Sequence, residues 1–105
     1  MPRTYSEAFL RKLNNDPNEF NNLGIDLAKA CTKANLPMLY VAKALDVSKL
    51  TIFHWFRGRD IRQIRRPKVY AFLALVERDT AEGKLPAVSM KAAKAYIEDM
   101  VGHEI

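Results

Sequence analysis

Residues 46–58, with the sequence DVSKLTIFHWFRG, carry the clearest structural pattern in this 105-residue chain. Ser48 is placed to cap a helix with its hydroxyl, and Gly58 is placed to end that helix in the left-handed conformation that glycine adopts readily. Because a helix turns by about 100° per residue, three side chains fall within about 60° of Ser48: Thr51, Ile52 and Trp55. The segment therefore predicts a turn followed by a short helix, 48–57, with one inward face.

The opposite face of this helix carries a mixture of cationic, aromatic and aliphatic side chains. By the same rotation its members are Leu50, Phe53, His54 and Arg57, with Lys49 at the edge. Arginine and lysine can donate to the acceptors of guanine, and apolar side chains can contact the methyl group of thymine. Two neighbouring apolar residues, Leu50 and Phe53, are also typical of a protein interface. The residues of this face are therefore compatible with either DNA or another protein as the partner.

The preceding residues predict a second helix packed against this one. Pro37 can open a helix that runs through Leu45, and Ala42 is small at the point where the two helices should cross most closely. Asp46 and Val47 then form the turn. The expected core of the two-helix unit consists of Ala42, Leu45, Val47, Ile52 and Trp55. This pattern is typical of a helix-turn-helix, in which the second helix projects from the domain and fits a DNA major groove.

The N-terminal part of the sequence predicts two further helices. A capping-box pattern indicates a short helix over residues 4–13, and Asp16 followed by Pro17 indicates a helix over residues 17–34. Gly24 lies inside this helix, where it permits close packing. The apolar stripe of the helix consists of Phe20, Leu23, Leu27, Ala30, Cys31 and Ala34.

The C-terminal part predicts two more helices. Pro67 can begin a helix that Gly83 ends, and Ser89 can cap a C-terminal extension helix over residues 89–101. The residues available to the core are Tyr70, Leu73, Ala74 and Val76 in the first of these helices, and Ala93, Tyr96, Ile97 and Met100 in the second. Residues 59–64 fit either a helical turn or a loop.

The length of the chain favours one compact domain over residues 1–105, because it allows one modest core and no second domain. Signals for the starts and ends of helices recur at short intervals along the chain, so we expect this domain to be all-α. The net charge of +5 suits a polyanionic partner. Six basic residues are concentrated in residues 57–68, where Asp60 is the only acid. We expect DNA phosphates to be contacted by Ser48 and by the basic residues that follow the exposed helix: Arg59, Arg62, Arg65, Arg66 and Lys68.

Over about residues 23–76 the chain resembles the Cro and phage-repressor type of helix-turn-helix DNA-binding domain, which has a lambda-repressor-like fold. The matching positions are Leu23, Gly24, Leu27, Leu36, Ala42, Val47, Ser48, Thr51, Ile52, Trp55 and Gly58. The resemblance implies a five-helix core, a recognition helix that opens at Ser48, and dimers on symmetric operators. Two places depart from the family pattern. Asp46 stands where glycine is usual, and Pro37 with Met38 replaces a polar pair that touches the DNA backbone in the family.

The sequence predicts no catalytic site, metal or cofactor. His54 and His103 are its only histidines, Cys31 is its only cysteine, and no metal-ligand spacing or phosphate-binding glycine loop occurs. No apolar run approaches the length of a membrane span, and the N-terminus lacks the apolar core of a secretion signal. We therefore expect a protein that is not an enzyme and has no membrane partner. We expect it in the cytoplasm of a bacterial or phage-infected cell, associated with the nucleoid.

These observations favour sequence-specific binding of double-stranded DNA through helix 48–57, in a small transcriptional regulator or repressor of viral or mobile-element type. Because one helix reads only a few base pairs, useful specificity favours a homodimer on half-sites about one DNA turn apart. One alternative is a protein-interaction module that docks on a transcription or replication protein through Leu50, Phe53 and Phe56. Another is an accessory factor in DNA packaging or recombination.

Overall fold

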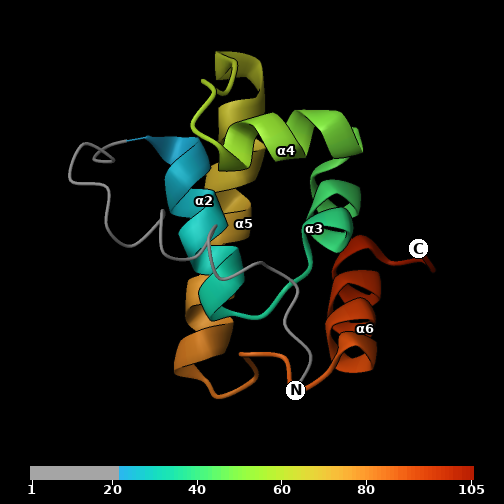
Figure 1. Cartoon of the computed structure of the whole chain (residues 1–105). Helices are drawn as coiled ribbons and strands as arrows, with labels where there is room; N and C mark the ends of the chain where they lie inside the picture. The colour runs from blue at the N-terminus through green and yellow to red at the C-terminus, as the bar shows by residue number, and fades with distance from the viewer. Residues whose placement is uncertain (1–21) are drawn as a thin grey trace.

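The computed structural model describes residues 22–105, which contain five α-helices, one short 3₁₀ turn and no strand (Figure 1). The elements in chain order are α2 (Leu23–Lys33), α3 (Met38–Leu45), α4 (Lys49–Phe56), η1 (Gln63–Arg65), α5 (Arg66–Ala81) and α6 (Met90–Val101). The all-helical class expected from the sequence is confirmed for this part of the chain. The helix predicted over residues 4–13 lies outside the described residues.

The first described helix is shorter than its sequence pattern indicated. We expected one helix over residues 17–34, but Asn22 has extended backbone angles, φ −94° and ψ 113°, so α2 begins at Leu23. The Asn22 side-chain oxygen accepts a hydrogen bond from the Ile25 amide at 3.1 Å and thereby caps the helix. A local asparagine cap therefore sets the start of α2, and the Pro17 start lies outside the described residues.

Most other helix ends follow the sequence pattern. Ser48 and Ser89 cap α4 and α6 by accepting hydrogen bonds from backbone amides three residues later. Asp46 adopts the left-handed conformation that ends α3, with φ 56°. Three glycines take positive φ values after helices as expected: Gly58, Gly83 and Gly102. The sequence left residues 59–64 undecided between a helical turn and a loop; residues 59–62 form a loop, and residues 63–64 belong to η1.

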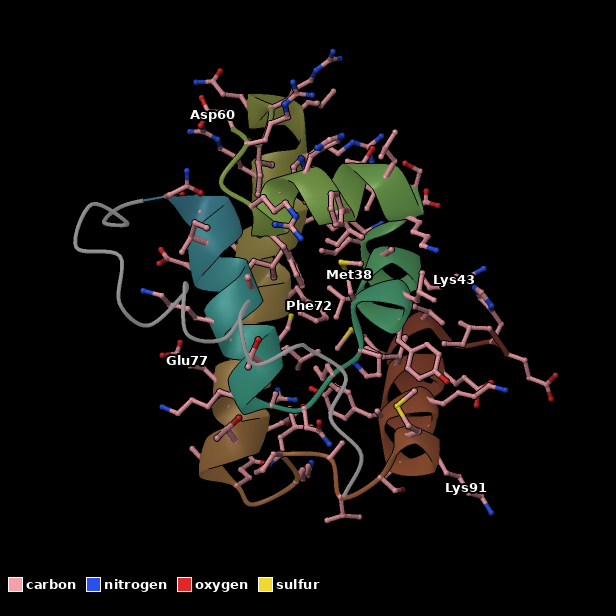
Figure 2. All side chains as sticks on the ribbon, viewed as in Figure 1. Met38, Lys43, Asp60, Phe72, Glu77 and Lys91 are labelled. Carbon is pink, nitrogen blue, oxygen red and sulfur yellow. The ribbon has the colours of Figure 1, made fainter. Side chains whose placement is uncertain are left out.

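The helices pack around one apolar core. In Figure 1, α4 lies across the N-terminal end of α2 and the C-terminal end of α3, while α5 runs beside α2 and α6 lies against α3. The largest fully buried side chains come from every α-helix and from the loops before α3 and after α4; they include Leu27, Leu36, Leu45, Ile52, Phe56, Ile61, Val69 and Ile97. Figure 2 shows Phe72 in the interior, whereas Asp60 and Lys91 point outward.

Two details of the predicted core are confirmed or corrected by burial. Cys31 is fully buried, and burial holds the pKa of its thiol far above the ordinary value, so it is a neutral core residue as expected. In α5, Tyr70 is 57% exposed and Ala74 is also exposed, so their assignment to the core was wrong. Val76 is buried as expected, and the other buried residues of α5 are Val69, Phe72 and Asp79. The helices that α5 contacts are α2 and α3.

Gly24 lies at the crossing of α2 and α4. A Cβ atom built on Gly24 would overlap the backbone carbonyl oxygen of Trp55. This oxygen is already held in place, because it accepts a hydrogen bond from the Gly58 amide at 3.0 Å. The close packing that we expected at Gly24 is therefore a contact between two backbones, and it permits no side chain.

The Gly24→Ala variant tests this contact. Overpacking against a backbone atom is expected to destabilise the fold by about 2 kcal/mol. The helix preference of alanine alone would instead stabilise it by about 1 kcal/mol. Urea unfolding followed by circular dichroism decides the sign. Lys33→Ala, at an exposed site of the same helix, should change the unfolding free energy by less than about 0.5 kcal/mol. A stabilised Gly24→Ala variant would contradict the proposed overlap.

Asp79 connects α5 to α6. Its carboxylate is buried, with a residue exposure of 4%, and it accepts a 2.6 Å hydrogen bond from the Tyr96 hydroxyl. Arg78 approaches the other carboxylate oxygen at 3.4 Å. The Tyr96 hydrogen bond, aided by Arg78, lowers the pKa of Asp79, whereas burial and the same hydrogen bond raise the pKa of Tyr96. The ionised form of Asp79 is therefore the form that holds α6 to α5.

The Asp79→Asn variant is expected to be less stable than the wild-type chain at neutral pH. Because the pKa of Asp79 is lower in the folded state than in the unfolded state, its stabilising contribution is complete above about pH 4. The contribution is lost as the pH falls through the lower folded value. Unfolding free energies measured from pH 7 to pH 2 should therefore converge below about pH 4. A difference that stays constant over this range would show that the charge of Asp79 is not involved.

Candidate nucleic-acid interface

The inward side of α4 anchors this helix to the domain. Ile52 and Trp55 are buried, as are Ala42 and Leu45 of α3, and Val47 in the turn is half-buried. Phe56 is also buried, with 1% exposure, so its expected role as a docking side chain on the surface was wrong. The reason is that both α2 and α3 contact α4, so a wider arc of this helix is covered than one partner helix would cover.

Both ends of α4 are fixed by side-chain hydrogen bonds. At its start, the Ser48 hydroxyl accepts from the Thr51 amide at 3.1 Å and donates to the Thr51 hydroxyl at 2.9 Å. At its end, the Asn22 amide group donates to the Gly58 carbonyl at 2.8 Å. Asn22 therefore caps α2 and holds the end of α4 at the same time. We did not identify Asn22 from the sequence, although an asparagine directly before the Leu23-Gly24 pair is a helix-cap signal.

One exposed face of α4 consists of the residues that we expected to meet DNA bases. Lys49, Leu50 and Arg57 are exposed, and Phe53 is at 36% exposure. The guanidinium carbon of Arg57 lies over the Phe53 ring, 4.4 Å from its centroid. The ring of half-buried His54 makes an edge contact with Phe53, with 5.7 Å between the centroids. Aromatic and cationic groups thus form a contiguous surface on this face.

The second exposed face of α4 borders a groove of about 470 Å³. Ser48, Thr51 and His54 line it from the helix, and Arg59, Arg62 and Arg65 line it from the loop and η1. Asp46 and Asp60 also line the groove. We had assigned Thr51 to the inward face, but it is half-buried and contributes to this groove. Three of the expected phosphate-binding arginines are therefore brought beside the start of α4.

Hydrogen bonds attach the basic loop to the rest of the domain. The Arg65 guanidinium donates to the Asp46 carbonyl at 3.3 Å, which connects η1 to the turn before α4. Arg66 donates through Nε to the Ile61 carbonyl at 2.8 Å and lies 3.9 Å from the Asp60 carboxylate. Arg66 is therefore a loop-fixing residue in this structure, and it does not line the groove.

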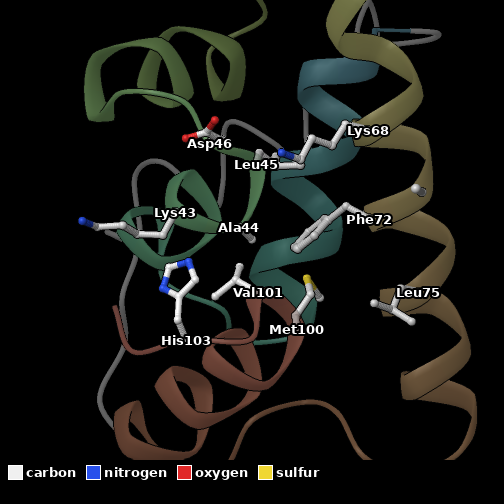
Figure 3. Close-up of a pocket in the computed structure, with 11 residues that line it drawn as sticks. Lys43, Ala44, Leu45, Asp46, Lys68, Phe72, Leu75, Met100, Val101 and His103 are labelled. Carbon is white, nitrogen blue, oxygen red and sulfur yellow. The ribbon is translucent and has the colours of Figure 1, made fainter.

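Lys68 does not line the α4 groove. It is exposed on α5 and lines a small hollow with Leu45, Ile64 and Arg65. It also borders a groove of about 550 Å³ between α3, α5 and the end of α6. Figure 3 shows this second groove, where Lys43 and His103 lie near the apolar side chains Phe72, Met100 and Val101. This groove contains none of the residues expected to face DNA bases.

Metal sites, membrane-spanning helices and similar proteins were also considered. No cluster of three or more histidine, cysteine, aspartate or glutamate side chains in residues 22–105 is arranged to hold a metal ion. None of the helices in this part of the chain is long and apolar enough to cross a membrane. Comparison with known protein families, with curated proteins and with solved structures found no match to this chain. The function of this chain is therefore inferred from the geometry of α4 and its surroundings.

Proposed function

We propose that this protein binds double-stranded DNA sequence-specifically by inserting α4 into the major groove. In this proposal α3, the turn at Asp46 and α4 are a helix-turn-helix of the Cro and phage-repressor type. The observation that carries the proposal is the position of α4, which is anchored on one side while its other side is bordered by three arginines. A major groove about 12 Å wide accepts a helix presented in this way.

The exposed residues of α4 supply groups that can distinguish base pairs. Arg57 is the strongest candidate, because a guanidinium can donate two parallel hydrogen bonds to guanine O6 and N7. Lys49 and His54 can donate to the same kind of acceptor, and Leu50 and Phe53 can contact thymine methyl groups. These are the five residues that we propose to face the bases.

The arginines of the adjoining groove suit the DNA backbone. Arg59, Arg62 and Arg65 lie beside Ser48 at the start of α4, so an inserted helix would bring them near phosphates. Lys68 and Arg66 extend the basic surface along η1 and α5. Contacts of this kind provide affinity and orientation, while the bases provide sequence preference.

We further propose a biological role as a small cytoplasmic transcriptional regulator or repressor of viral or mobile-element type, acting as a homodimer. A dimer follows from the small number of base pairs that one helix reads. The second candidate function is docking on a transcription or replication protein. The observation that favours it is the 64% exposure of Leu50, beside Phe53. It predicts weak DNA binding without sequence preference.

Selection from a randomised duplex pool tests sequence-specific binding. The wild-type chain should enrich a motif that contains a guanine, and Arg57→Ala should lose the preference at that position by about 1–3 kcal/mol. Lys91→Ala removes the same charge from α6 and should leave the motif unchanged. If no duplex is bound even at low salt, DNA binding is excluded. If binding enriches no sequence, the docking function is favoured.

The Arg62→Ala variant separates phosphate contact from base contact. Each phosphate contact adds about 0.9 to the slope of log K against log salt concentration. Arg62→Ala should therefore reduce this slope by about 1 and weaken binding equally on selected and unrelated duplexes. Fluorescence anisotropy at four or more salt concentrations measures both effects. An unchanged slope would show that Arg62 does not contact a phosphate.

A further inference from the structure

The exposed face of α4 contains one pair of side chains that are already organised before any ligand binds. Phe53 and Arg57 are separated by four residues, which brings their side chains together on one face of a helix. The Arg57 guanidinium lies over the Phe53 ring at 4.4 Å from the centroid. Such a contact provides cation–π attraction.

We infer that Phe53 and Arg57 form a single recognition unit for a guanine whose neighbouring base pair contains a thymine. This inference rests on the proposed DNA binding and names the base step that α4 would select. Arg57 reads the guanine, and Phe53 has two effects: it positions the guanidinium, and it contacts the methyl group of the thymine.

The positioning effect follows from the flexibility of arginine. A free arginine side chain samples many rotamers, and ordering it on DNA would reduce affinity. The Phe53 ring restricts the guanidinium before binding, so less freedom is lost when the hydrogen bonds to guanine form. The ring of His54 also makes an edge contact with the Phe53 ring.

The contact of Phe53 with thymine follows from the distance between the Phe53 ring and the Arg57 guanidinium. A guanidinium that donates to both O6 and N7 lies close to the plane of the guanine. Neighbouring base pairs are about 3.4 Å apart along the DNA axis. In the proposed recognition unit the Phe53 ring lies face to face with that guanidinium, so that the contact of 4.4 Å between guanidinium carbon and ring centroid brings the ring to the level of the next base pair. The apolar group that a base pair presents in the major groove is the C5 methyl of thymine.

The surrounding residues are compatible with this assignment. Phe53 retains 36% exposure although Arg57 covers part of it, so part of the ring is open to a methyl group. Leu50 lies one turn earlier on the same face with 64% exposure. Arginine alone can read a guanine, and it needs no apolar neighbour to do so. A cation beside an aromatic ring matches a guanine beside a thymine, because the cation meets the guanine acceptors and the ring meets the thymine methyl.

Atomic changes in the DNA test the inference directly. The probe is the duplex selected by the wild-type chain, in which 7-deazaguanine removes only the N7 acceptor and deoxyuridine removes only the thymine methyl. We expect the wild-type chain to lose about tenfold in affinity with 7-deazaguanine. It should lose about threefold with deoxyuridine, the effect of one methyl group.

Variants of the protein then show which side chain is responsible for each loss of affinity. In Phe53→Ala both penalties should fall below about twofold. Phe53→Tyr keeps the ring and should retain both penalties. Leu50→Ala, an apolar truncation on the same face, should weaken binding to the natural and 7-deazaguanine duplexes equally and so keep the guanine penalty. Thermal unfolding of each variant verifies that α4 is folded.

The outcomes distinguish this inference from the proposed function. If Phe53→Ala keeps the full 7-deazaguanine penalty, Phe53 does not position Arg57, and the inference fails while DNA binding stands. A selected motif without a thymine next to the Arg57-dependent guanine also overturns it. If the wild-type chain selects no sequence at all, the proposed function fails first. Loss of both penalties in Phe53→Ala with rescue in Phe53→Tyr supports the recognition unit.

Discussion

The position of α4 depends on the contact between two backbones, at Gly24 in α2 and at Trp55 in α4. Because no Cβ separates them, the helices approach closely enough for the Asn22 side chain to reach the Gly58 carbonyl at 2.8 Å. This arrangement fixes the C-terminal end of α4, and the Ser48 cap fixes its start. Burial of Trp55 and Phe56 then stabilises the helix against rotation about its own axis. The direction of every exposed side chain on α4 follows from these contacts.

Helix ends were the part of the fold that local sequence predicted well. The caps at Ser48 and Ser89 and the left-handed glycines require only neighbouring residues, so their pattern is visible without tertiary information. The register of buried faces was harder to predict. Tyr70 was assigned to the core although Val69 and Phe72 occupy it, because the contact face of α5 is chosen by α2 and α3. Helical periodicity alone does not resolve a shift of one residue.

The candidate site was predictable in its composition and less so in its geometry. The sequence separated an inward and an outward face of helix 48–57, but it did not indicate that Phe56 is covered or that Thr51 lies beside the arginine loop. Both depend on elements distant in sequence, α2 and η1. The contact of the Arg57 guanidinium with the Phe53 ring was similarly not predicted, since a spacing of four residues permits this contact without requiring it.

The two exposed faces of α4 differ in how their charges are held, and this difference has a physical consequence for recognition. On the groove side, Arg65 is bonded to the Asp46 carbonyl, while Arg66 fixes the loop through the Ile61 carbonyl. The spacing between the basic loop and the helix is therefore set within the protein. On the other side, the Arg57 guanidinium lies over the Phe53 ring, and an aromatic ring orients a cation without neutralising its charge. A guanidinium donates its hydrogen bonds in its own plane, and an aromatic ring that lies over it does not compete for those donors. This property suits the reading of a flat base edge better than the binding of a phosphate.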